Sequence, residues 1–315
     1  MIAPAFDGAF RAHERFLWGL CYRLTGSAAD ADDLVQETFV RAIERPPLGP
    51  QESWRGWLVQ VAMNLGRDLL RRRRRQAYVG PWLPAPIETA EDEPPAFELP
   101  LDGTMTTEGR YDLLESVSFA FLLALEALTP QQRAVLLLRD VFDYSVRETA
   151  AALAISEPCV KTTHHRARRV LRDYDRERQV PTRALQEQTR QVLVQFMAAV
   201  ANGDVAAVEA LLAQSVRCVS DGAGEYFTGK IPIIGPARVA RFNVKLGQRR
   251  LHGARFELRM INGLPAMVGE FSGGRPGEPP RLVMRCDLDR DGRIGALQFV
   301  VATRKLSAVR FPLPG

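Results

Sequence analysis

Side chains suited to binding a nucleic acid repeat at helical spacing near the middle of the chain. A capping box, Ser145-Val146-Arg147-Glu148, begins one helix, and Ser156 caps the next after a short turn. Two helices so joined, the second of them cationic, form a helix–turn–helix that can enter the major groove of DNA, although a solvated basic helix is the alternative. Early residues of the second helix would contact base edges, and later arginines would neutralise phosphates. The predicted DNA-binding residues are Lys161, Thr162, His165, Arg166 and Arg169.

A second cationic surface follows the helix expected over residues 53–75. Trp54 and Trp57 mark its apolar side, and a polar stripe lies opposite them. The run Arg71–Arg75 suits the negative end of the helix dipole, which explains part of it structurally. Beside a helix–turn–helix, it also indicates a second DNA contact. The residues of this contact are Asn64, Arg67, Arg71 and Arg72.

An acidic helix near the N-terminus is unsuited to DNA. It begins at the capping box Ser27-Ala28-Ala29-Asp30 and ends near Arg45, before two prolines. The helix dipole alone favours acids in its first turns. Because polar side chains also share one exposed face, we expect this face to meet a basic protein partner. Its residues are Asp32, Asp33, Gln36 and Glu37.

No motif for catalysis or metal binding emerges from the sequence. Asp287–Ile294 begins like a calcium-binding EF-hand loop, but its twelfth position is Gln298 and strands flank it, which favours a hairpin turn. The four cysteines are isolated and lack zinc-site spacing. The carboxylates that could serve an enzyme lie in no catalytic motif: Asp221, Glu257, Glu270 and Asp287. We therefore predict no catalytic residue, no metal and no cofactor.

The elements that carry these residues divide the chain into four parts. Helical patterns cover residues 5–76 and 110–178, and the proline-rich segment 77–109 links them. This linker lies in an acidic strip, because residues 81–112 hold eight acids and one arginine. In residues 179–315, two helices precede short β-type runs, which predicts an α+β domain with a curved antiparallel sheet. The fold class is therefore multidomain, with two all-α domains and one α+β domain.

The composition is that of a soluble globular protein. Of 315 residues, 46% are hydrophobic and 25% are charged, and the formal net charge is +5. No apolar run approaches the roughly 18 residues of a membrane span, and the N-terminus has no features of an export signal. We expect a cytoplasmic protein without membrane association.

Residues 6–175 resemble an extracytoplasmic-function sigma factor of the sigma-70 family. The resemblance implies that the acidic helix binds the β′ clamp of core RNA polymerase and that the tryptophan-containing helix contacts the promoter −10 element. The helix–turn–helix would read the −35 element beside the β flap. The three residue sets named above take these roles by position, and His164-His165 departs from the pair usual in the family. The matching segments are Tyr22–Gly26, Asp32–Phe39, Trp57–Asp68, Leu128–Arg133 and Val160–Arg168.

The remainder resembles the sigma-factor subgroup with a C-terminal SnoaL-like domain, a cone-shaped fold with a curved sheet. Tyr78–Pro86 looks like the linker signature of that subgroup, and Asp221–Glu225 resembles its Asp-Gly-Gly-Gly-Lys turn, with Ala223 and Glu225 departing from it. The terminal Asn-Pro-Asp-Lys-Leu pattern is reduced to Ala302–Leu306. We therefore expect the C-terminal domain to dock on the linker and to modulate activity. The expected regulatory residues are Trp82, Leu83, Pro84, Asp221, Gly222 and Gly224.

Two other functions stay open at this point. A ligand-sensing repressor would use the C-terminal domain as its sensor, but it would need no acidic face for polymerase. A SnoaL-like cyclase or isomerase fused to a DNA-binding unit would need an acid or base in an apolar pocket. The sequence also leaves open a small-molecule ligand of the C-terminal domain.

Overall fold

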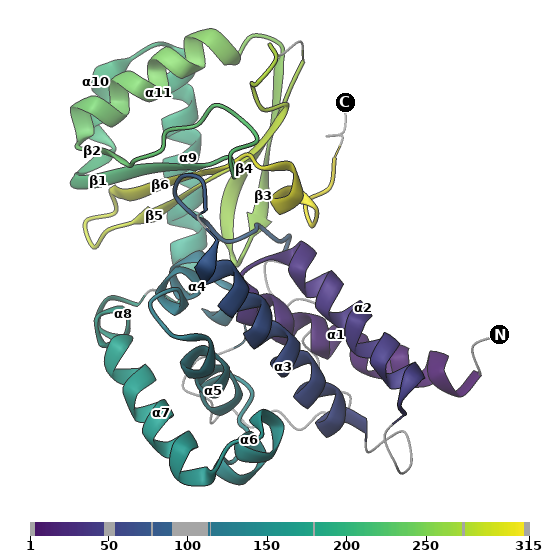
Figure 1. Cartoon of the computed structure of the whole chain (residues 1–315). Helices are drawn as coiled ribbons and strands as arrows, with labels where there is room; N and C mark the ends of the chain where they lie inside the picture. The colour runs from purple at the N-terminus through teal and green to yellow at the C-terminus, as the bar shows by residue number, and fades with distance from the viewer. Residues whose placement is uncertain are drawn as a thin grey trace. The chain divides into compact units, whose positions relative to one another are not determined.

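The chain folds into two compact units (Figure 1). The first comprises residues 1–77 and 92–180, and the second comprises residues 78–91 and 181–315. The predicted linker is therefore divided, because its residues 78–89 fold with the second unit, while residues 77 and 90–109 lie outside the described residues. The computed structural model describes residues 4–46, 54–76, 78–89, 113, 115–178, 180–272 and 275–311.

The described part of the first unit is helical, as predicted. Serine or threonine side chains accept hydrogen bonds from first-turn amides at the starts of several helices, so the caps read from the sequence set where these helices begin. The helices are α1 (Pro4–Thr25), α2 (Ala28–Glu44), α3 (Trp54–Arg75), α4 (Phe119–Leu125), α5 (Pro130–Asp140), α6 (Val146–Leu153), α7 (Glu157–Val170) and α8 (Arg172–Glu177).

Helices α6 and α7 form the predicted helix–turn–helix. Ser145 and Glu148 make both hydrogen bonds of the capping box, and Ser156 caps α7. Ala154 ends α6 in the left-handed conformation, with φ 51° and ψ 48°, which turns the chain sharply into α7. Val160 is fully buried, so α7 packs one side inward and leaves the other to solvent.

The buried side of α3 differs from the one that its apolar stripe indicated. Trp57, on that stripe, is only half-buried, whereas Arg67, on the predicted polar stripe, is 8% exposed. The reason is that α3 contacts α1 and α2 on one side and α5 and α6 on another. A single hydrophobic stripe cannot reveal a second packing surface on the same helix.

The second unit is an α+β domain around a six-stranded sheet with the strand order β2-β1-β6-β5-β4-β3. Its apolar core includes Leu193, Phe196, Val244 and Leu297, which come from two helices and a central strand. The helices are α9 (Arg183–Ala201), α10 (Val205–Ala210) and α11 (Pro236–Arg250). The strands are β1 (Leu212–Asp221), β2 (Ile233–Ile234), β3 (Ala254–Ile261), β4 (Leu264–Phe271), β5 (Arg281–Leu288) and β6 (Ile294–Val300).

The sheet is mixed, so the expectation of an antiparallel sheet was wrong for one pair. Strands β1 and β6 run parallel, with Cys218 opposite Leu297, whereas the other pairs are antiparallel. Local alternation of polar and apolar residues is the same for either direction, so it could not reveal this pairing. The run that resembled an EF-hand is the β5–β6 hairpin, as expected, with Gly292 at a φ of 75° in its turn.

Candidate nucleic-acid interface

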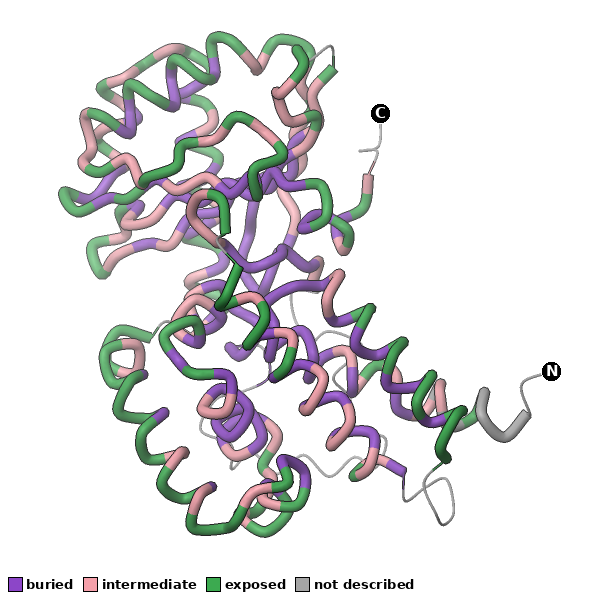
Figure 2. The backbone as a smooth tube through the Cα atoms, in the orientation of Figure 1, coloured by how far each residue is buried: buried purple, intermediate pink, exposed green. Residues whose placement is uncertain are grey.

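The outer side of α7 presents every residue predicted to bind DNA on the helix–turn–helix (Figure 2). Its one acid, Glu157, lies at the first position of the helix. The exposed residues are Lys161, Thr162, His165, Arg166 and Arg169. The lysine and the two arginines of this set have no ion-pair partner among the described residues, so the helix offers three cations to an anionic ligand.

The inner side of α7 is fixed to α5 through the buried carboxylate of Asp140. His164 Nε2 lies 2.8 Å from Asp140 Oδ1, and Arg168 donates to both carboxylate oxygens at 2.6 and 3.0 Å. Burial acts to raise the pKa of Asp140, but the hydrogen bonds and charges of His164 and Arg168 outweigh burial and hold this pKa below its ordinary value. His164 and Arg168 therefore fix the position of α7, and His165 faces solvent.

Asp140→Asn is expected to lower the free energy of unfolding of the first unit by about 1–3 kcal/mol, because it leaves His164 and Arg168 without their anion. The folded-state pKa of Asp140 is lowered, so its stabilisation is present above the ordinary carboxyl pKa of about 4 and disappears as pH falls through the lowered value. Thermal unfolding of wild type and variant should therefore differ at pH 7 and converge in acid. Asp173→Asn, at an exposed carboxylate, is the control; an equal effect of both would contradict the assignment.

Arginines of α3 bind backbone carbonyls at the ends of neighbouring helices. Arg67 donates to the carbonyl of Leu153 at 3.1 Å, where α6 ends, and also binds the Asn64 side chain. Arg73 donates to the carbonyl of Thr25 at 2.9 Å, where α1 ends. Cations at these positions satisfy the unpaired carbonyls and the negative end of each helix dipole. In this arrangement Arg67 is occupied within the unit and unavailable to DNA.

The other two residues predicted to lie near −10 DNA are accessible. Arg71 is exposed and pairs with Asp68 at 2.8 Å, a surface contact that a phosphate can replace at little cost. Arg72 is exposed and has no ion-pair partner among the described side chains. The structure thus divides the predicted −10 set into buried Arg67 with half-buried Asn64, which bind each other, and the exposed Arg71 and Arg72.

Helix α2 presents the predicted acidic face to solvent (Figure 2). Glu37 pairs with Arg41 at 2.9 Å, and both side chains are about half exposed. Val40 and Ile43, which no sequence signal singled out, are 40% and 48% exposed and continue the face from Gln36 at helical spacing. Exposed aliphatic residues beside acids are typical of protein interfaces. The predicted residues Asp32, Asp33, Gln36 and Glu37 are all exposed.

In the second unit, Asp221 at the end of β1 holds the linker. This fully buried carboxylate accepts hydrogen bonds from the Tyr78 hydroxyl at 2.6 Å and from the Leu83 amide at 2.7 Å. The Lys305 ammonium lies 2.6 Å from Asp221 and also donates to the Leu83 carbonyl. A buried ion pair therefore binds both backbone polar groups of one linker residue.

The buried part of the linker extends past the predicted anchor Trp82-Leu83-Pro84. Leu83, Ala85 and Ile87 are each at most 3% exposed, whereas Trp82 is half-buried. The Trp82 ring centroid lies 4.5 Å from the Lys305 ammonium, so the tryptophan covers the buried cation. Leucine and isoleucine thus supply the apolar anchor, and tryptophan shields the ion pair.

The last described linker residues extend the sheet beyond β3. Glu88 forms an antiparallel bridge with Ile261, and the Thr89 amide donates to the Met260 carbonyl at 2.9 Å. Asn262, at a φ of 52°, donates its amide to Ile87 and accepts the Ile87 amide on its side chain. This pairing covers the end of the edge strand β3 at Met260 and Ile261.

Glu88, the charged residue of the described linker residues 78–89, forms ion pairs with the second unit. Its carboxylate lies 2.8 Å from the Arg259 guanidinium and accepts hydrogen bonds from both the backbone amide and the side chain of Arg310. Burial acts to raise the pKa of Glu88, but these hydrogen bonds outweigh burial and lower it.

The turn after Asp221 needs small residues. A Cβ on Gly222 would lie 2.9 Å from a Thr228 methyl, and Gly224 has a φ of 78° against Val79. Ala223 stands where the subgroup has glycine and has a φ of 50°, so it carries backbone strain. The other departure, Glu225, accepts the Thr303 amide at 2.8 Å and so ties this turn to the C-terminal segment.

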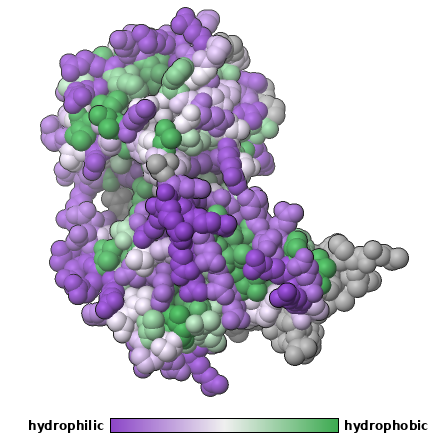
Figure 3. Space-filling model, viewed as in Figure 1, coloured by the Kyte–Doolittle hydropathy of each residue, from purple (hydrophilic) through white to green (hydrophobic). Residues whose placement is uncertain are grey.

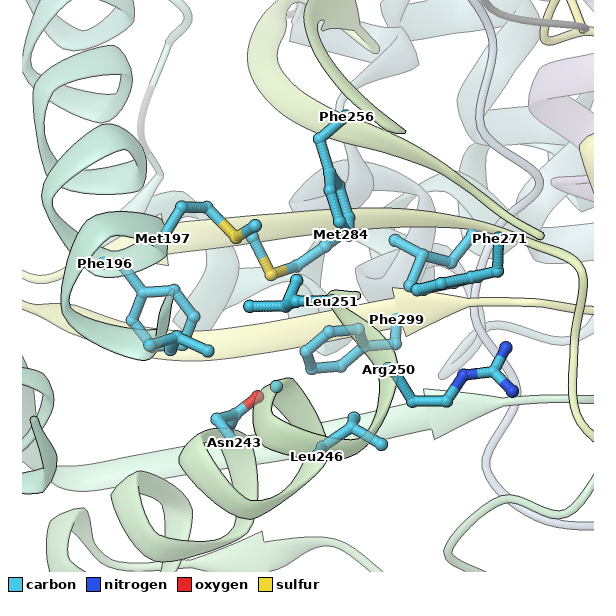
Figure 4. Close-up of a pocket in the computed structure, with 13 residues that line it drawn as sticks. Phe196, Met197, Asn243, Leu246, Arg250, Leu251, Phe256, Phe271, Met284 and Phe299 are labelled. Atoms are coloured by element: carbon cyan, nitrogen blue, oxygen red, sulfur yellow. The ribbon is translucent and has the colours of Figure 1, made fainter. Parts of the chain in front are cut away.

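The second unit contains a small, partly open apolar cavity between α9, α11 and the sheet (Figure 4). Phenylalanine and methionine side chains dominate its wall, and Asn243 and Arg250 are its polar residues. Arg250 is bound to Glu278 and stacks on Phe271 at 4.4 Å. The cavity measures about 50 Å³ and no carboxylate or histidine lines it.

The four carboxylates considered as catalytic candidates all have cationic partners. Asp221 pairs with Lys305, as described. The remaining pairs are Glu257 with Arg259, Glu270 with Arg281 and Asp287 with Arg285. The geometry brings none of them to the cavity wall.

Comparisons with known proteins cover both units. The chain matches the family Sigma-70 region 2 over residues 9–76 and Sigma-70, region 4 over residues 118–171. It is 32% identical over 297 residues to the ECF RNA polymerase sigma factor SigJ of Mycobacterium tuberculosis, covering 91% of this chain and 89% of SigJ. SigG of the same species is 38% identical over 178 residues, which are 51% of this chain and 47% of SigG. The crystal structure of SigJ has a TM-score of 0.68 and 28% identity, covering 96% of this chain and 98% of that one. In the described residues, no helix is long and apolar enough to cross a membrane.

Proposed function

The chain belongs to the extracytoplasmic-function sigma factors of RNA polymerase. We propose that separate exposed helical faces bind core polymerase and promoter DNA. Helix α2 binds core polymerase through Asp33, Gln36 and Glu37. Helix α7 reads the −35 element, and the end of α3 contacts −10 DNA. The observation that carries this assignment is the opposite charge of two exposed faces, acidic with aliphatic residues on α2 and cationic on α7.

Co-elution tests the proposal directly. The purified full-length chain should elute with core RNA polymerase on size exclusion, and the complex should retain a promoter fragment. A chain that binds the promoter alone and never co-elutes with core polymerase would support the repressor instead, because a repressor needs no polymerase face.

Substitutions of early and late residues of α7 are expected to affect DNA binding in different ways. Lys161→Ala, in an early turn, should relax base preference at one −35 position by about 1–3 kcal/mol. Arg169→Ala, in the last turn, should weaken all sequences alike and reduce the salt dependence of binding. Fluorescence anisotropy of the polymerase complex on matched and scrambled −35 fragments measures both. The same loss for both variants on both fragments would contradict the proposed orientation of α7.

We further infer that α6 must separate from α3 before Arg67 can contact −10 DNA. The contact of Arg67 with the Leu153 carbonyl supports this inference, because it buries a residue expected to meet DNA. The hydrogen bond itself is worth about 1 kcal/mol, and the packing of α6 against α3 adds to the cost that binding to polymerase must offset.

We propose that the C-terminal domain regulates the sigma unit through the linker and performs no catalysis. The ion-paired state of its candidate carboxylates supports this, as does the apolar wall of its cavity. A cavity of about 50 Å³ is also small beside the roughly 150 Å³ that admits benzene. The linker contact is more extensive, because it combines a buried ion pair, strand pairing and five consecutive buried residues, 83–87, which include Pro84 of the predicted anchor.

Trp82→Ala is expected to alter transcription by the full-length chain, because it exposes the Lys305–Asp221 pair to water and weakens the linker contact. A chain that ends at Arg178 lacks the domain to which Trp82 docks, so the same substitution should have little effect there. Transcription assays of the four proteins test this. Identical effects of the substitution in both backgrounds would remove the case for docking.

A further inference from the structure

Helix α11 carries a row of cations that the roles assigned so far do not use. Arg238, Arg241, Lys245 and Arg249 are spaced by three or four residues and are all exposed. The helix contains no acid over its 15 residues. Its inward side packs on the core through Val239, Ala240 and Val244 among others, so the cationic side faces outward. In Figure 3, hydrophilic atoms cover the surface where Figure 1 draws α11, with hydrophobic atoms among them.

These four cations differ from many others in the same unit because they have no described partner. Arg250, the next basic residue of α11, is bound to Glu278. Ion pairs also hold the cations of the strands and the C-terminal segment, namely Arg255, Arg259, Arg281, Arg285, Lys305 and Arg310. Four unpaired like charges on one helix repel one another, and an external anion would relieve this repulsion.

The same pattern occurs on α7, the recognition helix of the matched region 4. There, Arg168 is paired with Asp140, while Lys161, Arg166 and Arg169 are exposed without a described partner. Thus both helices combine an inward side fixed by packing or ion pairs with an outward row of unpaired cations.

We propose that the outer side of α11 binds the phosphate backbone of DNA without sequence preference. The row from Arg238 to Arg249 spans 11 residues, or about 16 Å at 1.5 Å per residue. One strand of B-DNA has a phosphate about every 3.4 Å of its axis, so this length of duplex holds four or five phosphates per strand. Because the strand winds around the axis, the straight row faces only some of them. The four cations outnumber the two partly exposed apolar side chains of this face, Phe242 and Leu246, so charge favours DNA, and a protein partner is an outcome of the test below.

This contact goes beyond promoter recognition by α7 and would add affinity for DNA next to the promoter elements. It rests on the proposed function only because regions 2 and 4 bring the chain to DNA. Each cation that neutralises a phosphate increases the magnitude of the negative slope of log K against log salt by about 0.9.

The test compares two triple variants of the full-length chain in complex with core polymerase. Arg238→Ala with Lys245→Ala and Arg249→Ala removes three cations of the row. The control, Arg217→Ala with Arg290→Ala and Arg293→Ala, removes three exposed cations that also lack described partners. All six side chains are exposed, and circular dichroism verifies that both variants fold. Anisotropy over a salt series is measured on a long promoter fragment and on one with a scrambled −35 element.

The α11 variant should lower the salt slope by up to about 2.7 on both fragments, and the control should match wild type. An unchanged slope for the α11 variant would overturn the proposal. Binding of both variants to core polymerase without DNA and to phosphatidylserine vesicles is measured as well. If the α11 variant loses affinity for core polymerase in the absence of DNA, the row binds an acidic protein surface. If it loses only its binding to the vesicles, the row binds a lipid surface, and either result would overturn the proposal. Preference of the wild type for the intact −35 fragment is scored separately, so failure of this inference is distinguishable from failure of the proposed function.

Discussion

Asp221→Asn is expected to lower the free energy of unfolding of the C-terminal unit by about 3–5 kcal/mol. The substitution leaves the Lys305 ammonium in a buried site without its anion, and breaking one side of a buried pair carries a cost of this size. It also weakens the hydrogen bonds that hold Tyr78 and Leu83. At about 2–4 °C per kcal/mol for a unit of this size, the melting temperature should fall by roughly 10 °C.

Thermal unfolding and limited proteolysis of the full-length chain measure the two consequences. The linker should become cleavable near Tyr78 to Leu83 at temperatures where the wild type resists. Asp291→Asn, at an exposed carboxylate of the β5–β6 turn, should change stability by no more than about 0.5 kcal/mol. Adding Lys305→Met to Asp221→Asn removes the unpaired charge and should restore part of the loss. A double variant no more stable than Asp221→Asn would show that the ion pair is not what holds this site.

The second large effect is expected on α2. Asp33→Ala with Glu37→Ala should weaken binding to core polymerase by about 2–5 kcal/mol, because a desolvated interface loses charges that meet cations of the partner. This energy corresponds to a decrease in affinity from about 30-fold to several thousand-fold. Alanine favours the helix, so the variant should fold as the wild type does.

Titration of core polymerase with labelled sigma chain measures this loss. Glu187→Ala with Asp291→Ala removes the same charge from exposed sites of the C-terminal unit and serves as the control. Val40→Ser with Ile43→Ser should also weaken binding, since both aliphatic side chains extend the acidic face. Wild-type affinity of the Asp33 and Glu37 variant would show that α2 does not contact polymerase.

Local signals predicted much of the fold. Helix starts at Ser27, Thr129, Ser145 and Ser156 followed from capping side chains, because a cap depends on three or four neighbouring residues. The parallel pairing of β1 with β6 did not follow, since it joins strands about 80 residues apart. The second packing surface of α3 did not follow either, because α3 there contacts α5 and α6, which lie far from it in the sequence.

The residues of the candidate sites also include some that local sequence predicts and others that depend on distant contacts. Exposed faces such as α7 follow from helical spacing, so their residues were predictable. The carbonyl contact of Arg67 depends on where a distant helix ends, and sequence spacing carries no such information. In the linker, the tryptophan was the more conspicuous residue, yet the structure buries Leu83 and Ile87 more deeply. A buried acceptor such as Asp221 gives no sequence signal of its own beyond the resemblance of its turn.

This chain directs core RNA polymerase to promoters, and we propose that α2 and α7 carry this activity. The most direct test is transcription of sheared genomic DNA from the source organism by core polymerase, with transcript 5′ ends mapped. Wild-type chain should produce a defined set of start sites that share −35 and −10 elements, and Arg166→Ala with Arg169→Ala should lose them. Start sites that are the same with and without the chain, or that persist with that variant, would contradict the account.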